Sequence, residues 1–73
     1  PDMIDTLESV RKELARIRAQ LAGAEAVLER IRAHGDPLLA DKEASTRLLI
    51  EALGVQAEAL AQQLSDGPAR VLH

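Results

Sequence analysis

An unbroken repeat of apolar residues runs through the first half of this 73-residue chain. From Met3 to Ile31, residues at alternating spacings of four and three are all apolar. The positions between these two ends are Leu7, Val10, Leu14, Ile17, Leu21, Ala24 and Leu28. Such a heptad repeat is typical of an α-helix that packs against a partner helix along its whole length. The repeat therefore constrains the fold strongly, although it indicates no substrate and no reaction.

The second half of the chain predicts a helix that could be this partner. Its main apolar stripe consists of Leu39, Thr46, Ile50, Leu53, Ala57, Leu60 and Leu64, widened by Leu49 and Ala61. Between the halves, His34-Gly35-Asp36-Pro37 combines a helix stop with a helix start. Here His34 can bond the last carbonyls, Gly35 can adopt the left-handed conformation, Asp36 can act as N-cap, and Pro37 suits the first helical position. So short a connection folds the second helix back antiparallel to the first.

These patterns predict an all-α fold, a single antiparallel helical hairpin of the coiled-coil type. The predicted limits are one domain over 1–73, a first helix over about 2–33, a turn over 34–36, a second helix over about 37–65 and a tail over 66–73. The second helix is expected to end at Ser65-Asp66-Gly67-Pro68, because Gly and Pro both disfavour a continuing helix. A chain of this length buries only about 60% of its unfolded surface, so we expect hairpins to pair into a four-helix bundle.

Each predicted helix also carries a second apolar row, and these rows form the candidate interaction face. In the second helix the row is Leu48, Ala52, Val55 and Ala59, and in the first it is Ala15, Ala19, Ala22 and Ala26. Ala is also the best helix former on a solvated surface, and isolated exposed Leu or Val side chains are common. However, Leu48 and Val55 lie two turns apart on one line with Ala52 between them, which is the layout of an interface. A lone hairpin has no core in which to bury such a row.

Composition excludes several classes of function. The net charge is −3 and the chain has no Cys, Phe, Tyr or Trp. A nucleic-acid-binding protein usually has a clustered basic face and aromatic stacking residues, so we expect no nucleic-acid partner. No apolar run approaches the length of a membrane span, no signal-peptide pattern opens the chain, and no thiolate is present to bind a metal. We expect no membrane association, no cofactor, no metal, and a cytoplasmic location.

One segment resembles a known enzyme family. Leu7-Glu8-Ser9-Val10-Arg11-Lys12-Glu13-Leu14, continued by Ile17 and Leu21, is similar to the opening helix of the all-helical chorismate mutases. The resemblance implies that Arg11 would bind a substrate carboxylate, and that His34-Gly35-Asp36-Pro37 with Asp41-Lys42-Glu43 would correspond to the first loop of that family. The chain departs from the family in its shorter first helix, in lacking that helix's other cations, and in lacking a third helix. In size and layout it is also similar to the helical-hairpin co-chaperones of bacterial type III secretion.

We therefore predict a small protein–protein interaction or oligomerisation module that acts through apolar helix faces and has no enzymatic activity. Its expected partner is a second copy of the chain, as a homodimer or larger homo-oligomer. One alternative is an assembly co-chaperone of the secretion type, which would hold an amphipathic helix of a partner protein in a groove between its helices. The alternative from another class is a small helical enzyme resembling a truncated chorismate mutase, for which Arg11 would be indispensable.

Overall fold

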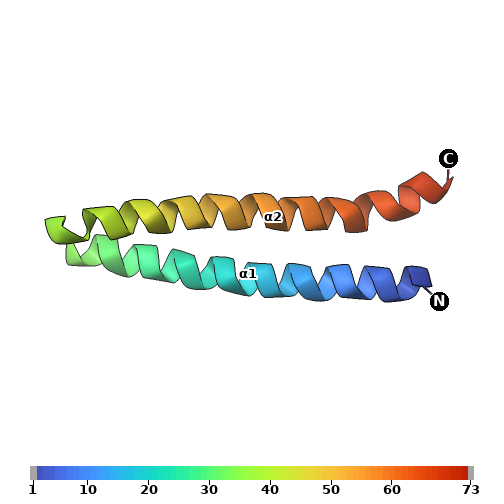
Figure 1. Cartoon of the computed structure of the whole chain (residues 1–73), viewed down its shortest axis with the longest axis horizontal. Helices are drawn as coiled ribbons and strands as arrows, with labels where there is room; N and C mark the ends of the chain where they lie inside the picture. Colours follow the sequence, from blue (N-terminus) through green and yellow to red (C-terminus); the bar gives the residue numbers. More distant parts are fainter. Residues whose placement is uncertain (1, 73) are drawn as a thin grey trace.

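The computed structural model of this protein describes the backbone of residues 2–72 and the side chains of residues 6–65. It contains α1 (Asp2–His34), a short 3-10 helix η1 (Pro37–Leu39) and α2 (Ala40–Leu72). The two long helices lie side by side and antiparallel, with the chain ends at one end of the molecule and the turn at the other (Figure 1). The prediction of an all-helical hairpin of two helices is confirmed.

The end of α1 has the predicted stop signal. Gly35 has a φ of 63°, the left-handed conformation in which a side chain would be strained. Its amide donates to the carbonyl of Ile31 at 3.4 Å, which satisfies one of the last acceptors of the helix. Nδ1 of His34 donates to a second such acceptor, the carbonyl oxygen of Arg30, at 3.0 Å. His34 therefore acts as a capping residue of α1.

The next helical segment, η1, begins at Pro37, two residues after Gly35. The side chain of Asp36 accepts a hydrogen bond from the amide of Leu38 at 3.0 Å, and Pro37 occupies the first turn, as predicted. The first turn is a 3-10 helix, closed by a 2.9 Å bond from the amide of Leu39 to the carbonyl of Asp36, and the α-helix begins only at Ala40. A tighter turn of this kind is common at helix ends because it satisfies orphan backbone groups.

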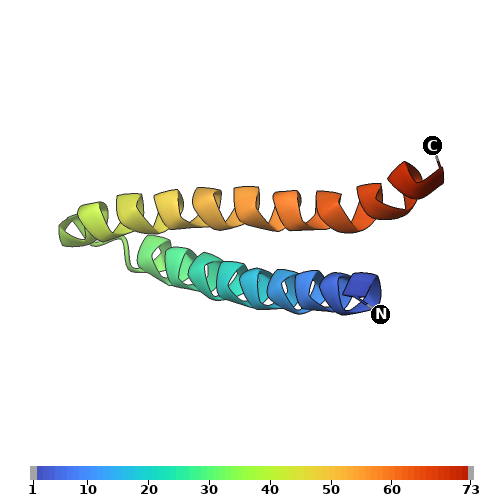
Figure 2. The ribbon, with the colours of Figure 1, turned by 45° about the vertical axis from the view of Figure 1, so that its right-hand side comes forward.

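The predicted end of the second helix is wrong. The sequence predicts a stop at residue 65 and a tail over 66–73, whereas α2 continues to Leu72. Pro68 lacks an amide hydrogen and so removes one hydrogen bond, but the residues around it remain part of the α-helix. The ribbon of α2 turns away from α1 over its last turns (Figures 1 and 2). Gly67 and Pro68 are therefore accommodated within the helix. His73 lies outside the described residues.

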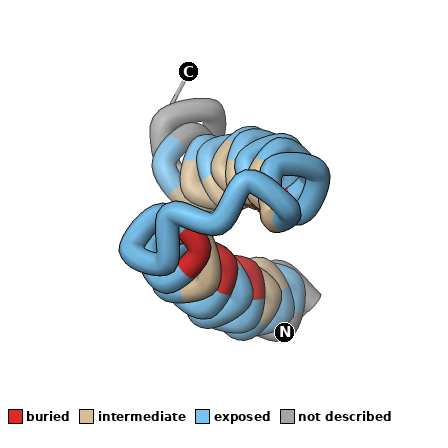
Figure 3. The backbone as a smooth tube through the Cα atoms, turned by 90° about the vertical axis from the view of Figure 1, so that its left-hand side faces the viewer, coloured by how far each residue is buried: buried red, intermediate tan, exposed pale blue. Residues whose placement is uncertain are grey.

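The core lies between the two helices and comes from the predicted heptad positions. The buried apolar residues are Leu14, Ile17, Ala24 and Ile31 of α1 and Leu53 of α2. In Figure 3 the buried segments of α1 lie on the side that faces α2. Thr46 is also buried, and its hydroxyl donates to the carbonyl of Lys42 at 2.7 Å, so its polar atom is satisfied. Leu49, predicted to widen this core, is 51% exposed, and that part of the prediction is wrong.

The hairpin is long and thin, and it leaves much of its surface uncovered. Its accessible surface is 5734 Å², whereas a globular monomer of this mass exposes about 4,400 Å². Its radius of gyration is 16.7 Å, against about 11 Å for a compact chain of this length. No large side chain among the described residues is fully buried. Two helices alone therefore provide one thin strip of core.

Candidate interaction surface

Charged residues are distributed very differently over the two helices. They surround the water-facing side of α1, where they are Glu8, Arg11, Lys12, Glu13, Arg16, Arg18, Glu25, Glu29, Arg30 and Arg32. Between Ala44 and Ser65, α2 has only Arg47, Glu51 and Glu58. Since successive residues are about 100° apart around a helix, these three follow one edge of α2 and leave the rest uncharged. Over residues 44–65, α2 therefore has a largely uncharged surface, unlike α1.

Within residues 6–65, the large exposed apolar side chains are also confined to the second half of the hairpin. Among the described residues they are Leu38, 90% exposed, Leu48, 67%, Leu49, 51%, and Val55, 71%. None of them lies on α1. Leu38 is at the turn, whereas the other three lie along α2. Scattered single apolar residues need no explanation, but three on one uncharged helix surface indicate a contact site.

Leu48, Ala52, Val55 and Ala59, which we call the outer stripe of α2, lie on one side of that helix. All four are exposed. Val55 follows the buried Leu53 by two residues and so lies about 200° from it around the helix, which directs it away from α1. The outer stripe thus forms a continuous apolar line on the side of α2 opposite the core.

The predicted row on α1 has a different character. Ala15, Ala19, Ala22 and Ala26 are all exposed and lie on the side of α1 opposite the core. The structure therefore brings the two rows to opposite edges of the hairpin rather than to one surface. The α1 row is flanked by long charged side chains, among them Arg16, whose Nε donates to Oε1 of Glu13 at 3.2 Å. This hydrogen bond, and the charge of Glu13, raise the pKa of Arg16 above its usual value.

A shallow hollow lies beside the outer stripe. It is lined by Glu51, Gly54, Val55, Glu58, Ala59 and Gln62. Gly54 leaves open space where a Cβ would stand, and this deepens the surface between the two carboxylates. The sequence analysis did not include Glu51, Gly54 or Glu58 in a site. Their spacing along one helix edge was readable, but a hollow formed by a missing side chain becomes evident only in three dimensions.

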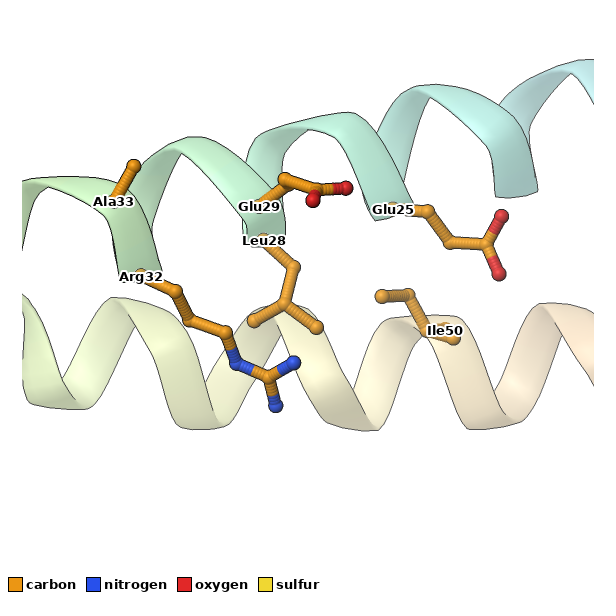
Figure 4. A pocket seen from close by; sticks show the side chains of 6 residues that line it. All are labelled: Glu25, Leu28, Glu29, Arg32, Ala33 and Ile50. Atoms are coloured by element: carbon orange, nitrogen blue, oxygen red, sulfur yellow. The ribbon is translucent and has the colours of Figure 1, made fainter.

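A second groove lies between the helices near the turn (Figure 4). Leu28 and Ile50 lie between α1 and α2 there, with Glu25 and Glu29 on the α1 side. Arg32 reaches across to α2, where its Nε lies 3.3 Å from Oε2 of Glu43. The groove is open to solvent and its cation is already paired with a carboxylate. We regard it as the exposed margin of the core.

The candidate enzymatic residue Arg11 lies on the surface. Its side chain is 70% exposed, and Nη1 is 3.8 Å from Oε1 of Glu8 in the preceding turn.

Within the described part of the chain, no three His, Cys, Asp or Glu side chains are grouped so that they could hold a metal ion. None of the described helices combines the length and apolar character needed to cross a bilayer. Comparisons with protein-family models, with curated proteins and with solved structures find no match.

Proposed function

We propose that this protein is a helical oligomerisation module, in which the outer stripe of α2 packs against a second copy of the chain. The observation that carries the proposal is the asymmetry between the helices. Over residues 6–65, large apolar side chains are exposed along α2 and not along α1, and α2 has almost no charge where they lie. A helix that is apolar on two opposite sides is characteristic of one covered on both.

The area left uncovered supports the same proposal. The chain exposes about 1,300 Å² more than a globular monomer of its mass would, given its surface of 5734 Å². A protein–protein contact of standard size covers about 800 Å² on each partner. One such contact would therefore bring the surface of each chain much closer to that of a compact protein. Association would also reduce the solvent exposure of Leu48 and Val55.

Measuring the solution mass of two double variants tests this proposal. Leu48→Glu with Val55→Glu would put two carboxylates into the contact, where burying an unpaired charge costs several kcal/mol. Ala15→Glu with Ala22→Glu adds the same charge to exposed sites on α1 and is the matched control. We expect the wild type to be a dimer or larger in light scattering, the Leu48/Val55 variant to shift toward monomer, and the control to keep the wild-type mass.

A wild-type chain that remained a stably folded monomer at high micromolar concentration would refute self-association. In that case the outer stripe would be free to bind a helix of another protein, which is the co-chaperone alternative. A loss of mass in the α1 control variant, with none in the α2 variant, would also contradict the proposal because it would move the contact to the other edge of the hairpin.

A further inference from the structure

We infer that the contact is an antiparallel pairing of α2 with α2 of a second copy about a two-fold axis near Leu53 and Gly54. The inference rests on the proposed function and specifies its partner helix, direction and register. In this register Leu48 lies opposite Ala59 of the second copy, and Ala52 lies opposite Val55. By symmetry each of these pairs occurs twice.

The order of residue sizes along the outer stripe carries this inference. The stripe reads large, small, large, small as Leu48, Ala52, Val55 and Ala59, and all four are exposed. Reversing the direction of one copy sets every large residue against an Ala, which lets the helix axes approach closely with no gap. A parallel pairing in register would instead oppose Leu with Leu and Ala with Ala, so that the helices are held apart where the side chains are small.

The polar ends of the stripe agree with the two-fold symmetry. Continuing its spacing by one step each way gives Ser45 before Leu48 and Gln62 after Ala59, both exposed. In the antiparallel register these two residues face each other across the contact, and hydroxyl and amide groups can form hydrogen bonds. The stripe is therefore polar at both ends and apolar between them, and this order is the same when it is read in the opposite direction. An isologous contact requires such a self-complementary surface.

One flank of the contact would cover the remaining exposed Leu of the helix. Leu49 and Gln56 lie along this flank, and both are exposed in the hairpin. The register sets Leu49 of each copy beside Gln56 of the other, where the methylene groups of the glutamine side chain can cover the leucine. A single contact thus protects Leu48, Leu49 and Val55, the large apolar residues exposed on the described part of α2. This covers far more apolar surface than pairing through the Ala row of α1 would.

The charges on the other flank nearly cancel across the contact. This flank carries the hollow with Glu51 and Glu58, and Arg47 lies one turn from Glu51 on the same edge. The register sets Glu58 of one copy midway between Arg47 and Glu51 of the other, about 3 Å along the axis from each. Attraction to Arg47 therefore offsets repulsion from Glu51, and charges at an exposed rim are also screened by salt. The pairing is therefore expected to depend little on ionic strength.

The position of the outer stripe also determines the shape of the assembly. Because the stripe lies on the side of α2 away from α1, the four helices of the pair lie in a row, with the two copies of α2 in the middle. This arrangement differs from the closed four-helix bundle that the sequence predicts. A closed bundle would leave Leu48 and Val55 on its outer surface.

Cysteine cross-linking tests the register, and the chain has no native cysteine to interfere. We would make Leu48→Cys and Ala59→Cys as separate proteins and oxidise each alone and as a mixture. In the inferred register the mixture forms a 48–59 disulfide, whereas two copies of position 48 are about 16 Å apart along the axis, too far for a bond. Efficient cross-linking of either variant alone would indicate a parallel pair and overturn the inference. So would a disulfide between Leu48→Cys and Ala26→Cys, which would indicate head-to-tail packing of α2 on α1.

A charge substitution gives an independent readout. Glu51→Arg should turn the two repulsive Glu51–Glu58 pairs into attractive ones, keep the two Arg47–Glu58 pairs, and lower the dimer Kd about fivefold. Sedimentation at two ionic strengths should show little change in the wild type and a dimer that weakens with salt in this variant. A wild type that dimerises, loses its mass in the Leu48/Val55 variant and yet shows neither the 48–59 disulfide nor the tighter dimer of Glu51→Arg would refute the register and leave the proposed function standing. A monomeric wild type would refute both.

Discussion

Leu53→Ala should destabilise the hairpin by about 2.5 kcal/mol. Leu53 is 6% exposed and packs with Ile17 and Ala24 in the centre of the core. The substitution removes three buried carbons, which is about 2.4 kcal/mol at roughly 0.8 kcal/mol for each. The cavity left behind adds little here. Its neighbours Ile50 and Leu60 are only partly buried, so they can relax into the space.

The matched control is Leu48→Ala, the same deletion on the opposite side of the same helix. Leu48 is 67% exposed in the hairpin, so only about a third of the transfer energy, roughly 0.8 kcal/mol, can be lost within one chain. We would follow urea and thermal unfolding by circular dichroism at several protein concentrations. The Leu53→Ala change should lower Tm by about 10–20 °C at every concentration, given the usual sensitivity of a domain of this size.

The concentration dependence separates the two positions. If the outer stripe is a contact between copies, the loss of stability caused by Leu48→Ala should grow with protein concentration, because only the associated state buries that side chain. Equal losses of stability in Leu53→Ala and Leu48→Ala at the lowest concentration would refute the assignment of Leu53 to the core and Leu48 to the surface. A Leu48→Ala cost that did not change with concentration would count against the contact.

Three further predictions concern the core, the turn and the chemistry of the chain. Ile17→Asp, at a position only 4% exposed, should abolish the cooperative helical unfolding transition, whereas Leu21→Asp, at a half-buried position, should cost less because its carboxylate can reach water. A cooperative Ile17→Asp protein would contradict the core assignment. Asp36→Ala should cost about 1 kcal/mol in urea unfolding through loss of the bond to the Leu38 amide, while Asp36→Asn should cost less. The chain should not convert chorismate above background, since Arg11 is exposed beside Glu8; a rate that disappeared in Arg11→Ala would favour the enzymatic alternative.

Most of the fold follows from local sequence signals, and the error at the end of the second helix has a local cause. The heptad positions from Leu7 to Ile31 all become buried or half-buried, because a period near 3.6 keeps them on one side of the helix. The turn was predictable because Gly35 and Asp36 each satisfy a different set of orphan backbone groups. The end of the second helix was not predictable in this way. Gly and Pro make a helix less favourable by about 1 and 3 kcal/mol, but they do not forbid the helical conformation. Such penalties decide a boundary only when nothing else favours the helix.

For the candidate surface, residue spacing alone could not predict which of the two apolar rows is the better contact. Spacing alone grouped the outer stripe of α2 and the Ala row of α1 as equivalent second faces, since both recur at four, three and four. The structure separates them, because Leu48 and Val55 are exposed on a stretch of α2, residues 44–65, that has only three charges, while the Ala row is surrounded by charges. Burying a Leu or Val side chain contributes about 1.5–3 kcal/mol, whereas an Ala methyl adds less than 1. In the proposed association, the favourable free energy would therefore come mainly from α2, and the Ala residues would allow the helices to approach closely. Opposing Leu48 with Ala59 of a second copy uses both properties in one contact, which is why the direction of pairing, and not only its existence, is the property to measure.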